Sequence, residues 1–399
     1  MQKTCFAMPF MILYVLSFII ISYAERRRKD RYGVINIVVM EMRSKKAARR
    51  REDIMVRKIK FCMAGFGNVG KAFARLLLEK KAELAAEYGC EMLLTGVCTR
   101  SGGALVNADG LSFEKVLKMN ERKERFAGCK NFADGGVPEM ISASGAEIFL
   151  ELTTLSAGGG EPAAGYIRQA LNSGMHVITS NKGPEAWCFD ELNALAKKNG
   201  RLFLYESSVM GGAPLFSLVR HSLRGNRIVA VRGILNATTN FLLGELEKGA
   251  DFGAALKEAQ RMGIAEADPS ADINGLDGAA KICVLANILM NASVNPGMTY
   301  IKSLAGVSAA DLEAARGSGC RLKFICRAER DESGAVKTSV KPEMLRMDDP
   351  LANAGGASTA VTLYTDLAGE LSVVHTDPGI MQTAYGVYSD LLTVLEAAR

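Results

Sequence analysis

Gly65-Phe-Gly-Asn-Val-Gly70 has the G-x-G-x-x-G spacing of a dinucleotide-binding turn. Residues 59–64 before it are typical of a short strand, and residues 71–80 after it are typical of a helix. Glycines here permit a tight turn and a close backbone approach to a pyrophosphate, which then faces the helix N-terminus. We therefore predict an α/β fold with a Rossmann-type dinucleotide-binding domain; the alternative is a glycine-rich turn in another α/β protein. The candidate cofactor-binding residues of the turn are Gly65, Phe66, Gly67, Asn68, Val69 and Gly70.

The end of the next predicted strand, residues 92–98, indicates which nicotinamide cofactor binds. An acidic side chain at this point would bind the ribose 2′-hydroxyl of NAD. The chain has Thr99, Arg100 and Ser101 there instead. Arg100 can pair with a 2′-phosphate and Ser101 can donate to it, so the sequence favours NADP over NAD. A basic residue at this position can also simply cover the adenine face.

Further elements continue the predicted sheet. They are a parallel strand at 147–152, a helix at 161–173, and strands at 176–179, 201–205 and 227–232. Asn181-Lys-Gly-Pro184 lies at the carboxyl end of one of these strands, where open α/β sheets bind ligands. Thr153, Thr154 and Lys182 are therefore added to the candidate cofactor-binding residues.

Residues 266–281 place four carboxylates and a lysine within a short segment. Its first half is predicted as a loop, and an apolar helix is predicted to begin after Gly275. Asp277 and Lys281 are then four residues apart on one helical face. A lysine beside a carboxylate can give a proton to a carbonyl, but a solvated ion pair beside an acidic turn has the same spacing. A calcium loop is excluded, because Lys281 would stand where the bidentate glutamate must be.

The same region resembles homoserine dehydrogenases. Their run G-x-A-E-x-D-P-x-x-D-x-x-G-x-D-x-x-x-K is matched by Gly263-Ile-Ala-Glu-Ala-Asp-Pro-Ser-Ala-Asp-Ile-Asn-Gly-Leu-Asp-Gly-Ala-Ala-Lys281. The family's T-x-N-K and G-I-x-N-G-T-x-N-Y/F elements correspond to residues 179–182 and 233–241. The resemblance extends from about Lys60 to Leu392. It implies NAD(P)-dependent interconversion of L-aspartate 4-semialdehyde and L-homoserine, a step of threonine and methionine biosynthesis.

The resemblance also implies roles for individual residues. Lys281, oriented by Asp277, would protonate the alkoxide that forms from the aldehyde, and Lys182 would stabilise it or share the proton relay; which lysine gives the proton stays open. The implied catalytic residues are Lys281, Lys182 and Asp277, and the implied substrate-binding residues are Glu266, Asp272, Thr238 and Lys281.

The family's Y-E-x-x-V-x-x-G/A segment corresponds to Tyr205-Glu-Ser-Ser-Val-Met-Gly-Gly-Ala-Pro214. By resemblance it would hold a monovalent cation such as Na⁺ through Glu206, Val209, Gly211 and Ala213. The alternative is that Glu206 only holds the hinge between domains.

Two positions depart from the family pattern. Ala237 replaces the usual glycine, which is unfavourable if the backbone there needs a positive φ. A G-P-G-A-G loop near the C-terminus is reduced to Asp377-Pro-Gly-Ile380. Both motivate an alternative function, a related NAD(P)-dependent oxidoreductase acting on another small amino or hydroxy aldehyde. A non-catalytic dinucleotide sensor is disfavoured, because it would not need both lysines.

The expected organisation has a dinucleotide-binding domain at 55–200 and an α+β substrate and dimerisation domain at 201–364. The segment 365–399, with a closing helix at 383–392, would return to the first domain. Seven residues follow that helix, so we expect no appended effector domain and no allosteric inhibition by threonine. Apolar strands such as 228–231 fit the family's sheet-mediated homodimer, unless they face only their own core.

The charge and cysteine content of the chain limit the classes of partner that we expect. Residues 1–54 hold 12 Lys and Arg against 5 Asp and Glu, while the remainder holds 37 against 38, so the body is near neutral despite a net charge of +6. No basic stripe with interleaved aromatics is present, and nucleic acid is therefore an unexpected partner. The nine cysteines form no C-x-x-C or Cys/His cluster, which favours a reducing compartment without a zinc site.

Residues 1–54 are predicted to lie outside the fold. Residues 5–24 carry no charge and precede Arg26-Arg-Arg-Lys29, the pattern of a signal peptide or a membrane span. The alternative is a misassigned start, with translation beginning at Met55 directly before the first strand. We expect the catalytic body to be cytoplasmic in either case, with a membrane partner only if residues 1–24 are genuine.

Overall fold

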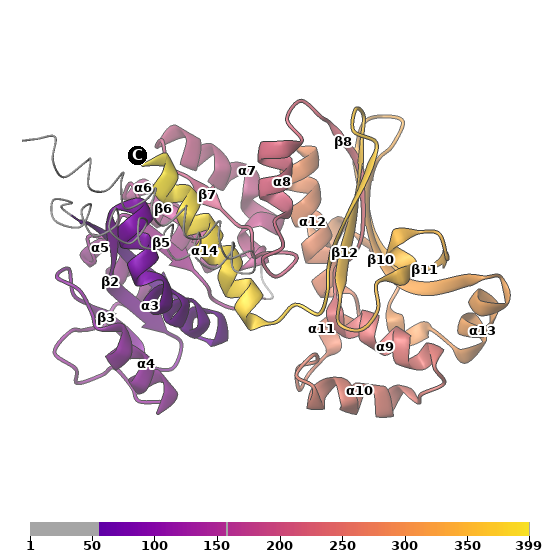
Figure 1. Ribbon diagram of the computed structural model, residues 1–399, viewed down its shortest axis with the longest axis horizontal. Coiled ribbons are helices and arrows are strands. Elements are labelled where there is room, and N and C mark those ends of the chain that lie inside the picture. Colours follow the sequence, from indigo (N-terminus) through magenta and orange to yellow (C-terminus); the bar gives the residue numbers. More distant parts are fainter. Residues whose placement is uncertain (1–55, 157–158, 399) are drawn as a thin grey trace, which may run out of the picture. The chain divides into compact units, whose positions relative to one another are not determined.

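The computed structural model describes residues 56–156 and 159–398 (Figure 1). The leader expected at residues 1–54, with both of its interpretations, lies outside the described residues. Within the described ranges, no helix is long and apolar enough to cross a membrane.

The first part of the chain contains a seven-stranded sheet in the order β4-β3-β2-β1-β5-β6-β7. Its strands are β1 (Arg57–Ala64), β2 (Cys90–Thr99), β3 (Gly103–Val106), β4 (Phe132–Ala133), β5 (Ile148–Glu151), β6 (His176–Thr179) and β7 (Phe203–Leu204). The β1, β5, β6 and β7 strands pair in parallel, whereas β3 pairs antiparallel with β2 and β4. The accompanying helices are α3 (Asn68–Tyr88), α4 (Phe113–Glu121), α5 (Gly136–Ala143), α6 (Ala163–Asn172) and α7 (Lys182–Lys198). The Rossmann-type α/β prediction is confirmed.

The composition of β1 suits its place inside this sheet. Phe61, Cys62, Met63 and Ala64 are all buried, as expected for a parallel strand with both faces covered. The strand predicted at 147–152 is β5, directly beside β1. The sequence analysis did not predict β3 and β4, which have four and two residues.

The second part contains a six-stranded sheet in the order β13-β12-β8-β10-β11-β9. Its strands are β8 (Ile228–Ile234), β9 (Tyr300–Ile301), β10 (Cys320–Arg330), β11 (Val336–Arg346), β12 (Thr359–Thr365) and β13 (Glu370–His375). All pairs are antiparallel except β9 with β11. Around it lie α8 (Leu215–Ser222), α9 (Ala237–Glu247), α10 (Phe252–Arg261), α11 (Ser270–Ile273), α12 (Leu276–Met290) and α13 (Ala309–Gly317), with short 3₁₀ helices at Pro296–Met298, Leu304–Gly306 and Pro350–Asn353.

The α12 helix lies between this sheet and α7, and it contacts β8, β10 and β11. It begins after Gly275, whose φ is +83° and whose added Cβ would lie 2.8 Å from Ile301 Cγ2. Only glycine suits both the left-handed backbone and this close approach. The helix predicted after Gly275 is therefore present, and part of the predicted loop before it forms the short α11.

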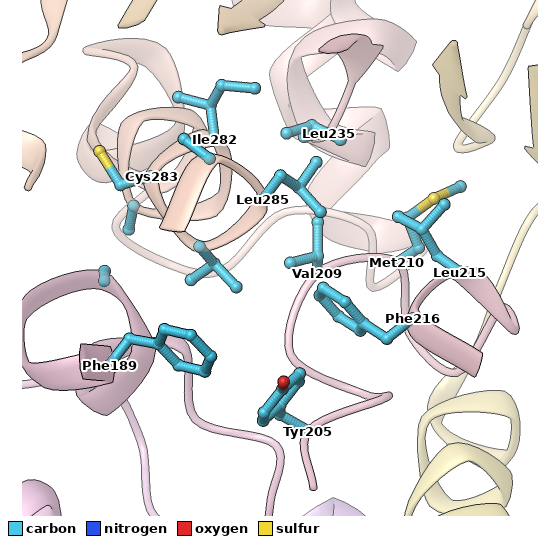
Figure 2. Packing of buried hydrophobic residues seen from close by; sticks show 14 of the residues in the cluster. Phe189, Tyr205, Val209, Met210, Leu215, Phe216, Leu235, Ile282, Cys283 and Leu285 are labelled. Atoms are coloured by element: carbon cyan, nitrogen blue, oxygen red, sulfur yellow. The ribbon is translucent and has the colours of Figure 1, made fainter. Parts of the chain in front are cut away.

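One hydrophobic core joins α12 to the segment that follows β7 (Figure 2). Ile282 and Leu285 of α12 belong to it, together with Val209, Met210 and Phe216. Figure 2 shows these side chains gathered between the α12 ribbon and the segment that carries residues 205–216. This packing fixes the middle of α12 relative to the segment after β7.

The C-terminal helix α14 (Ile380–Ala397) extends the predicted closing helix in both directions and contacts β6 (Figure 1). Ser207 Oγ donates to the Thr383 carbonyl at 2.7 Å, and the Glu206 N–H donates to Asp390 Oδ2 at 2.8 Å. A Cβ on Gly212 would lie 2.0 Å from the Gln382 carbonyl oxygen, so this contact requires glycine. The last helix therefore packs against the segment after β7.

Two of the strand residues expected at a dimer face, Ile228 and Val231, are buried in the structure. Ile228 and Val231 are 2% and 0% exposed within the single chain, so they face its own core. The alternative interpretation holds for these two residues, and they give no support to a dimer.

Candidate active site

Two lysines and one carboxylate, from two helices, form the centre of the site. Lys182 is the first residue of α7, and Asp277 and Lys281 lie one turn apart in α12. Lys182 Nζ is 2.9 Å from Asp277 Oδ1, and Lys281 Nζ is 2.9 Å from Asp277 Oδ2. The exposed fraction of the side chain is 22% for Lys182, 17% for Lys281 and 12% for Asp277. The three groups are therefore largely desolvated yet still reachable by a small molecule.

The local sequence explains how each lysine is placed. Asn181 caps α7 by accepting from the Gly183 N–H at 3.0 Å, which sets Lys182 at the carboxyl end of β6. Lys281 Nζ also donates to the Leu235 carbonyl at 2.8 Å, at the end of β8. The Lys281 ammonium is thus held by the backbone after β8 as well as by the shared carboxylate, whereas Lys182 is placed by the capped start of α7.

The electrostatics of the cluster are coupled. Burial alone would raise the pKa of Asp277, but the Lys182 and Lys281 ammonium groups hold that pKa well below its usual range. The Asp277 carboxylate in turn raises the pKa of Lys182, against the opposing effect of burial. Asp277 therefore stays ionised and Lys182 stays protonated near neutral pH, which leaves an acidic N–H group available to a bound oxygen.

Asn236 links this cluster to a second carboxylate. Its Nδ2 donates to Asp272 Oδ1 at 2.7 Å and to Asp277 Oδ2 at 2.9 Å. Its Oδ1 accepts from the Thr239 N–H at 2.8 Å, so the residue also caps α9. The sequence analysis did not single out Asn236, although an asparagine between a predicted strand and a helix is a recognisable N-cap.

Thr238 and Glu266, the other two residues expected to bind substrate, form no hydrogen bond or ion pair with the lysine cluster within the described part of the chain. Thr238 is buried, and its hydroxyl donates to the Ile264 carbonyl at 3.1 Å. Glu266 is exposed, and among the described residues no hydrogen bond or ion pair joins its carboxylate to the lysine cluster. The structure therefore brings Asp272 into the cluster and leaves the Glu266 side chain outside it.

The glycine turn has the shape that a dinucleotide requires. Gly65 has φ +90°, and its added Cβ would lie 2.4 Å from the Leu152 carbonyl oxygen. A Cβ on Gly70 would lie 2.7 Å from the Gly65 carbonyl oxygen. Gly67 is exposed with nothing within 4 Å of its Cβ position, directly before Asn68 and Val69 begin α3, while Phe66 is buried. An open backbone at a helix N-terminus fits a pyrophosphate group.

At the end of β2, Thr99 Oγ1 accepts from the Gly102 N–H at 2.8 Å and so holds the turn. Arg100 and Ser101 in this turn are both exposed. Both side chains are therefore open to solvent directly after β2.

A buried acid that the sequence analysis missed lies at the end of β5. The Glu151 carboxylate accepts from the Thr153 hydroxyl and, at 3.2 Å, from the Thr179 hydroxyl. Asn181 Nδ2 donates to Thr153 Oγ1 at 3.3 Å. Burial raises the pKa of Glu151 to about 7 despite these hydrogen bonds. The candidate Thr153 is thereby tied to the cap that positions Lys182, whereas Thr154 is exposed.

The residues expected to hold a cation have other partners. Glu206 Oε1 accepts from the Phe216 N–H and Oε2 from the Ser217 N–H, both at 2.8 Å, at the start of α8. Burial raises the pKa of Glu206 against these bonds. No group of three or more His, Cys, Asp or Glu that could hold a metal occurs within the described ranges. Glu206 thus has a structural partner at each oxygen, and the cation site at Glu206, Val209, Gly211 and Ala213 stays a prediction.

The chain is similar in sequence to proteins of one enzyme family. The family profile described as homoserine dehydrogenase matches residues 214–392, and the profile described as homoserine dehydrogenase, NAD binding domain, matches residues 65–206. The NAD(+)-dependent homoserine dehydrogenase of Pseudomonas canavaninivorans is 36% identical over 85% of this chain and 97% of its own length. The homoserine dehydrogenase of Methanocaldococcus jannaschii is 37% identical over 84% of this chain and 98% of its own length.

The chain belongs to the homoserine dehydrogenase family. A solved homoserine dehydrogenase from Thiobacillus denitrificans is similar to it in fold, with a TM-score of 0.73 and 30% identity over 86% of this chain and 74% of that chain. The resemblance expected from the sequence is confirmed, and so are an oxidoreductase of this family and a domain for a nicotinamide cofactor.

One departure from the homoserine dehydrogenase pattern proves harmless to the backbone. Ala237 is the first residue of α9 and is not among the residues with a positive φ. The positive φ that would make alanine unfavourable there is therefore not present, and a helical position suits alanine. In the shortened loop at residues 377–380, Asp377 has φ +42°. Its Oδ1 accepts from the Ala357 N–H at 3.0 Å, which ties the loop to the segment before β12.

Proposed function

We propose that this chain catalyses the NAD(P)-linked interconversion of L-aspartate 4-semialdehyde and L-homoserine. The observation that carries the proposal is the sharing of the Asp277 carboxylate by Lys182 and Lys281, at the carboxyl end of a strand in a dinucleotide-binding sheet. When bound, the reduced nicotinamide supplies hydride to the aldehyde carbon. The chain supplies preorganised N–H donors for the oxygen that becomes negative.

The hydrogen bonds indicate what each lysine contributes. Lys281 Nζ already donates to Asp277 and Leu235, which leaves one of its three N–H groups for the substrate oxygen. Lys182 Nζ is bonded to the other oxygen of the same carboxylate. A proton that Lys281 gives to the alkoxide can therefore be replaced through Asp277 from Lys182, or the two lysines can act in the reverse order. Asp277 keeps Lys182 protonated and holds the two lysine side chains close together.

The substrate carries an ammonium group that needs an acidic partner. Asp272, held by Asn236 beside the lysines, is our candidate for that contact. Thr238 and Glu266 are the further candidates, of which Glu266 would have to turn toward the cluster. Placing the ammonium at one side of the site and the reacting oxygen at the lysines orients the substrate for hydride transfer.

The test is the steady-state rate with L-homoserine and an oxidised nicotinamide cofactor, together with a panel of small aldehydes in the reverse direction. We expect L-homoserine to be oxidised and L-aspartate 4-semialdehyde to have the highest kcat/KM of the panel. Higher kcat/KM with a different amino or hydroxy aldehyde would favour the alternative that the shortened 377–380 loop motivates.

We also propose that NADP is preferred to NAD. The support is the exposed Arg100 and Ser101 after β2, where no acidic side chain is present to bind a 2′-hydroxyl. The NAD(+)-dependent relative from Pseudomonas canavaninivorans makes the ratio of the two rates informative. The Arg100→Ala variant should lower kcat/KM for NADP by about tenfold, the value of one charge-assisted contact, and leave NAD unaffected. Equal losses with both cofactors would assign Arg100 to the adenine face.

Assembly, location and the cation complete the proposal. We propose a homodimer in the cytoplasm, which light scattering at micromolar concentration and fractionation of the native host would test. An active monomer would contradict the dimer, and recovery of residues 1–24 in a membrane fraction would contradict the location. Activity that is unchanged when Na⁺ replaces a large organic cation would remove the cation from the proposal.

A further inference from the structure

Glu151 is a buried acid to which the proposed mechanism gives no role. It is the last residue of β5, and its exposed fraction is 0%. In the parallel sheet it pairs with Ala64, directly before the glycine turn, and with Thr179, the last residue of β6. Paired residues of neighbouring strands point to the same face of a sheet. The Glu151 side chain therefore lies between the strand that leads to the glycine turn and the strand that leads to Lys182.

Three donors converge on the Glu151 carboxyl group. Its Oε1 accepts from the Thr153 hydroxyl and, at 3.1 Å, from the Thr153 N–H. Its Oε2 accepts from the Thr179 hydroxyl at 3.2 Å. The two oxygens of one carboxyl group thus join the segment after β5 to the end of β6.

Asn181 gives these hydrogen bonds a fixed direction. Its N–H donates to Thr179 Oγ1 at 2.9 Å, and its Nδ2 donates to Thr153 Oγ1 at 3.3 Å. A threonine hydroxyl has a single proton, and because both hydroxyl oxygens accept from Asn181, both protons are left for Glu151. Asn181 is also the N-cap of α7. The carboxyl group is therefore connected to the first turn of α7, which carries Lys182.

The segment held by Glu151 also supports the glycine turn. A Cβ on Gly65 would lie 2.4 Å from the Leu152 carbonyl oxygen and 2.7 Å from the Thr153 nitrogen. The Leu152 N–H donates to the Ala64 carbonyl at 2.8 Å. The turn thus rests directly on residues 152 and 153, so a displacement of this segment would reach the backbone that faces a pyrophosphate.

We propose that Glu151 is a positioning residue that couples the two halves of the site: its buried carboxyl group holds the glycine turn through Thr153 and the start of α7 through Thr179. With no exposed surface, the carboxyl group itself touches neither substrate nor cofactor. It keeps the dinucleotide turn and the Lys182 helix in one fixed arrangement, which an oriented hydride transfer requires. The inference rests on the proposed function and on the role of Lys182 in it.

The first test measures cofactor binding without turnover. Glu151→Gln keeps the size of the side chain and one oxygen for Thr153, but it puts an amide NH₂ group where Thr179 donates. We expect the Kd for NADPH and the Kd for NADH, measured by fluorescence titration, each to rise about fivefold, within the range of coupling between neighbouring residues. The two losses should be equal, because the glycine turn faces the pyrophosphate that both cofactors contain.

Matched variants give the controls for binding. Glu79→Gln makes the same change at an exposed position of α3 and should leave both Kd values as in the wild type. Arg100→Ala should weaken NADPH alone, in contrast to Glu151→Gln. Wild-type Kd values for both cofactors in a folded Glu151→Gln variant would overturn the coupling to the glycine turn.

The second test measures turnover at saturating cofactor. Glu151→Gln should lower kcat with L-homoserine about tenfold and leave its KM nearly unchanged, because the hydrogen bonds of Glu151 reach the start of α7 and not Asp272. In the Lys182→Ala background, the same change should cause no further loss of kcat and should still raise the Kd for NADPH. An equal fold-loss of kcat in both backgrounds would mean that Glu151 only supports the fold, and would overturn the proposal.

A second variant keeps the proposal testable if Glu151→Gln does not fold. Thr179→Val removes one hydroxyl while keeping the shape of the side chain. It should lower kcat in the same direction and leave the Kd for NADPH nearly unchanged, because Thr153 keeps its bonds to Glu151. A wild-type kcat in folded Thr179→Val would contradict the connection to α7. Failure of the proposed function is distinguishable, because the wild-type chain would then not oxidise L-homoserine, while the titrations would still report on the glycine turn.

Discussion

Asp277 and Asp390 are both buried aspartates on helices, yet their surroundings move their pKa values in opposite directions. Asp277, at the lysine cluster, is surrounded by two ammonium groups that hold its pKa well below the usual range. Asp390, on α14, accepts from the Glu206 N–H, and burial raises its pKa to about 8. The comparison separates a carboxylate kept ionised for chemistry from a carboxyl group kept mainly neutral for packing.

The largest effect should come from removing a lysine of the cluster. Lys281→Ala and Lys182→Ala should each lower kcat by about 10²-fold or more, the range for losing an acid–base group. Lys197→Ala, at the exposed far end of α7, is the control and should match the wild type. Steady-state kinetics with L-homoserine measure the effect, and near wild-type turnover in the double lysine variant would contradict the mechanism.

The next effect should come from Asp277→Asn, which leaves the two ammonium groups together without their counter-charge. We expect kcat to fall by about tenfold or more and the alkaline limb to move to lower pH, because Asp277 is the main cause of the raised Lys182 pKa. Asp268→Asn, an exposed acid of the same segment, should behave as the wild type. An unshifted alkaline limb in Asp277→Asn would mean that neither lysine controls that limb.

A smaller effect should come from Asn236→Ala, which removes the link between Asp272 and Asp277 together with the cap of α9. The free energy of unfolding should fall by about 1 kcal/mol, the usual value of an N-cap. In addition, kcat/KM for L-homoserine should fall several-fold, which Asn295→Ala, a cap of a short 3₁₀ helix, should not cause. Denaturant unfolding and kinetics measure the two parts separately.

Asp390→Asn should leave turnover unchanged and alter only the pH dependence of stability. The folded pKa of Asp390 lies above its ordinary value of 3.8, at about 8, so this group favours the folded state most at low pH and loses that contribution as pH rises to about 8. The variant should therefore show a flatter decline of unfolding free energy from pH 4 to 8. Part of the decline should persist, because the pKa values of Glu151 and Glu185 are raised too. An identical decline in variant and wild type would contradict the assignment.

The sequence predicted the elements that are marked by apolar runs or by glycine at fixed places. The turn at residues 65–70, the parallel strands and the start of α12 after Gly275 all followed from such patterns. The pairing of Asp277 with Lys281 followed from helical spacing. The contact of Lys182 with Asp277 did not, because 95 residues separate them, and only resemblance to the family suggested that they meet.

Other features depend on tertiary contacts that spacing does not encode. Glu151, Glu185 and Asp390 look like ordinary surface acids in sequence, and only packing reveals that they are buried. Glu206 accepts from two amides at the start of α8, and its place in the sequence does not reveal that role. At Ala237 the glycine of relatives did not tell whether the backbone is left-handed or helical, and the structure shows that it is helical.

The return of α14 to the segment after β7 also constrains the order of folding during synthesis. The contacts Ser207–Thr383 and Glu206–Asp390 join residues 176 and 184 positions apart, so they cannot form until residues 380–397 have left the ribosome. Until then Gly212 and the buried ring of Tyr205 belong to a segment that lacks its covering helix. The dinucleotide-binding sheet, although made first, should thus be among the last parts to become fully protected from proteases, and nascent chains should depend on chaperones during that interval.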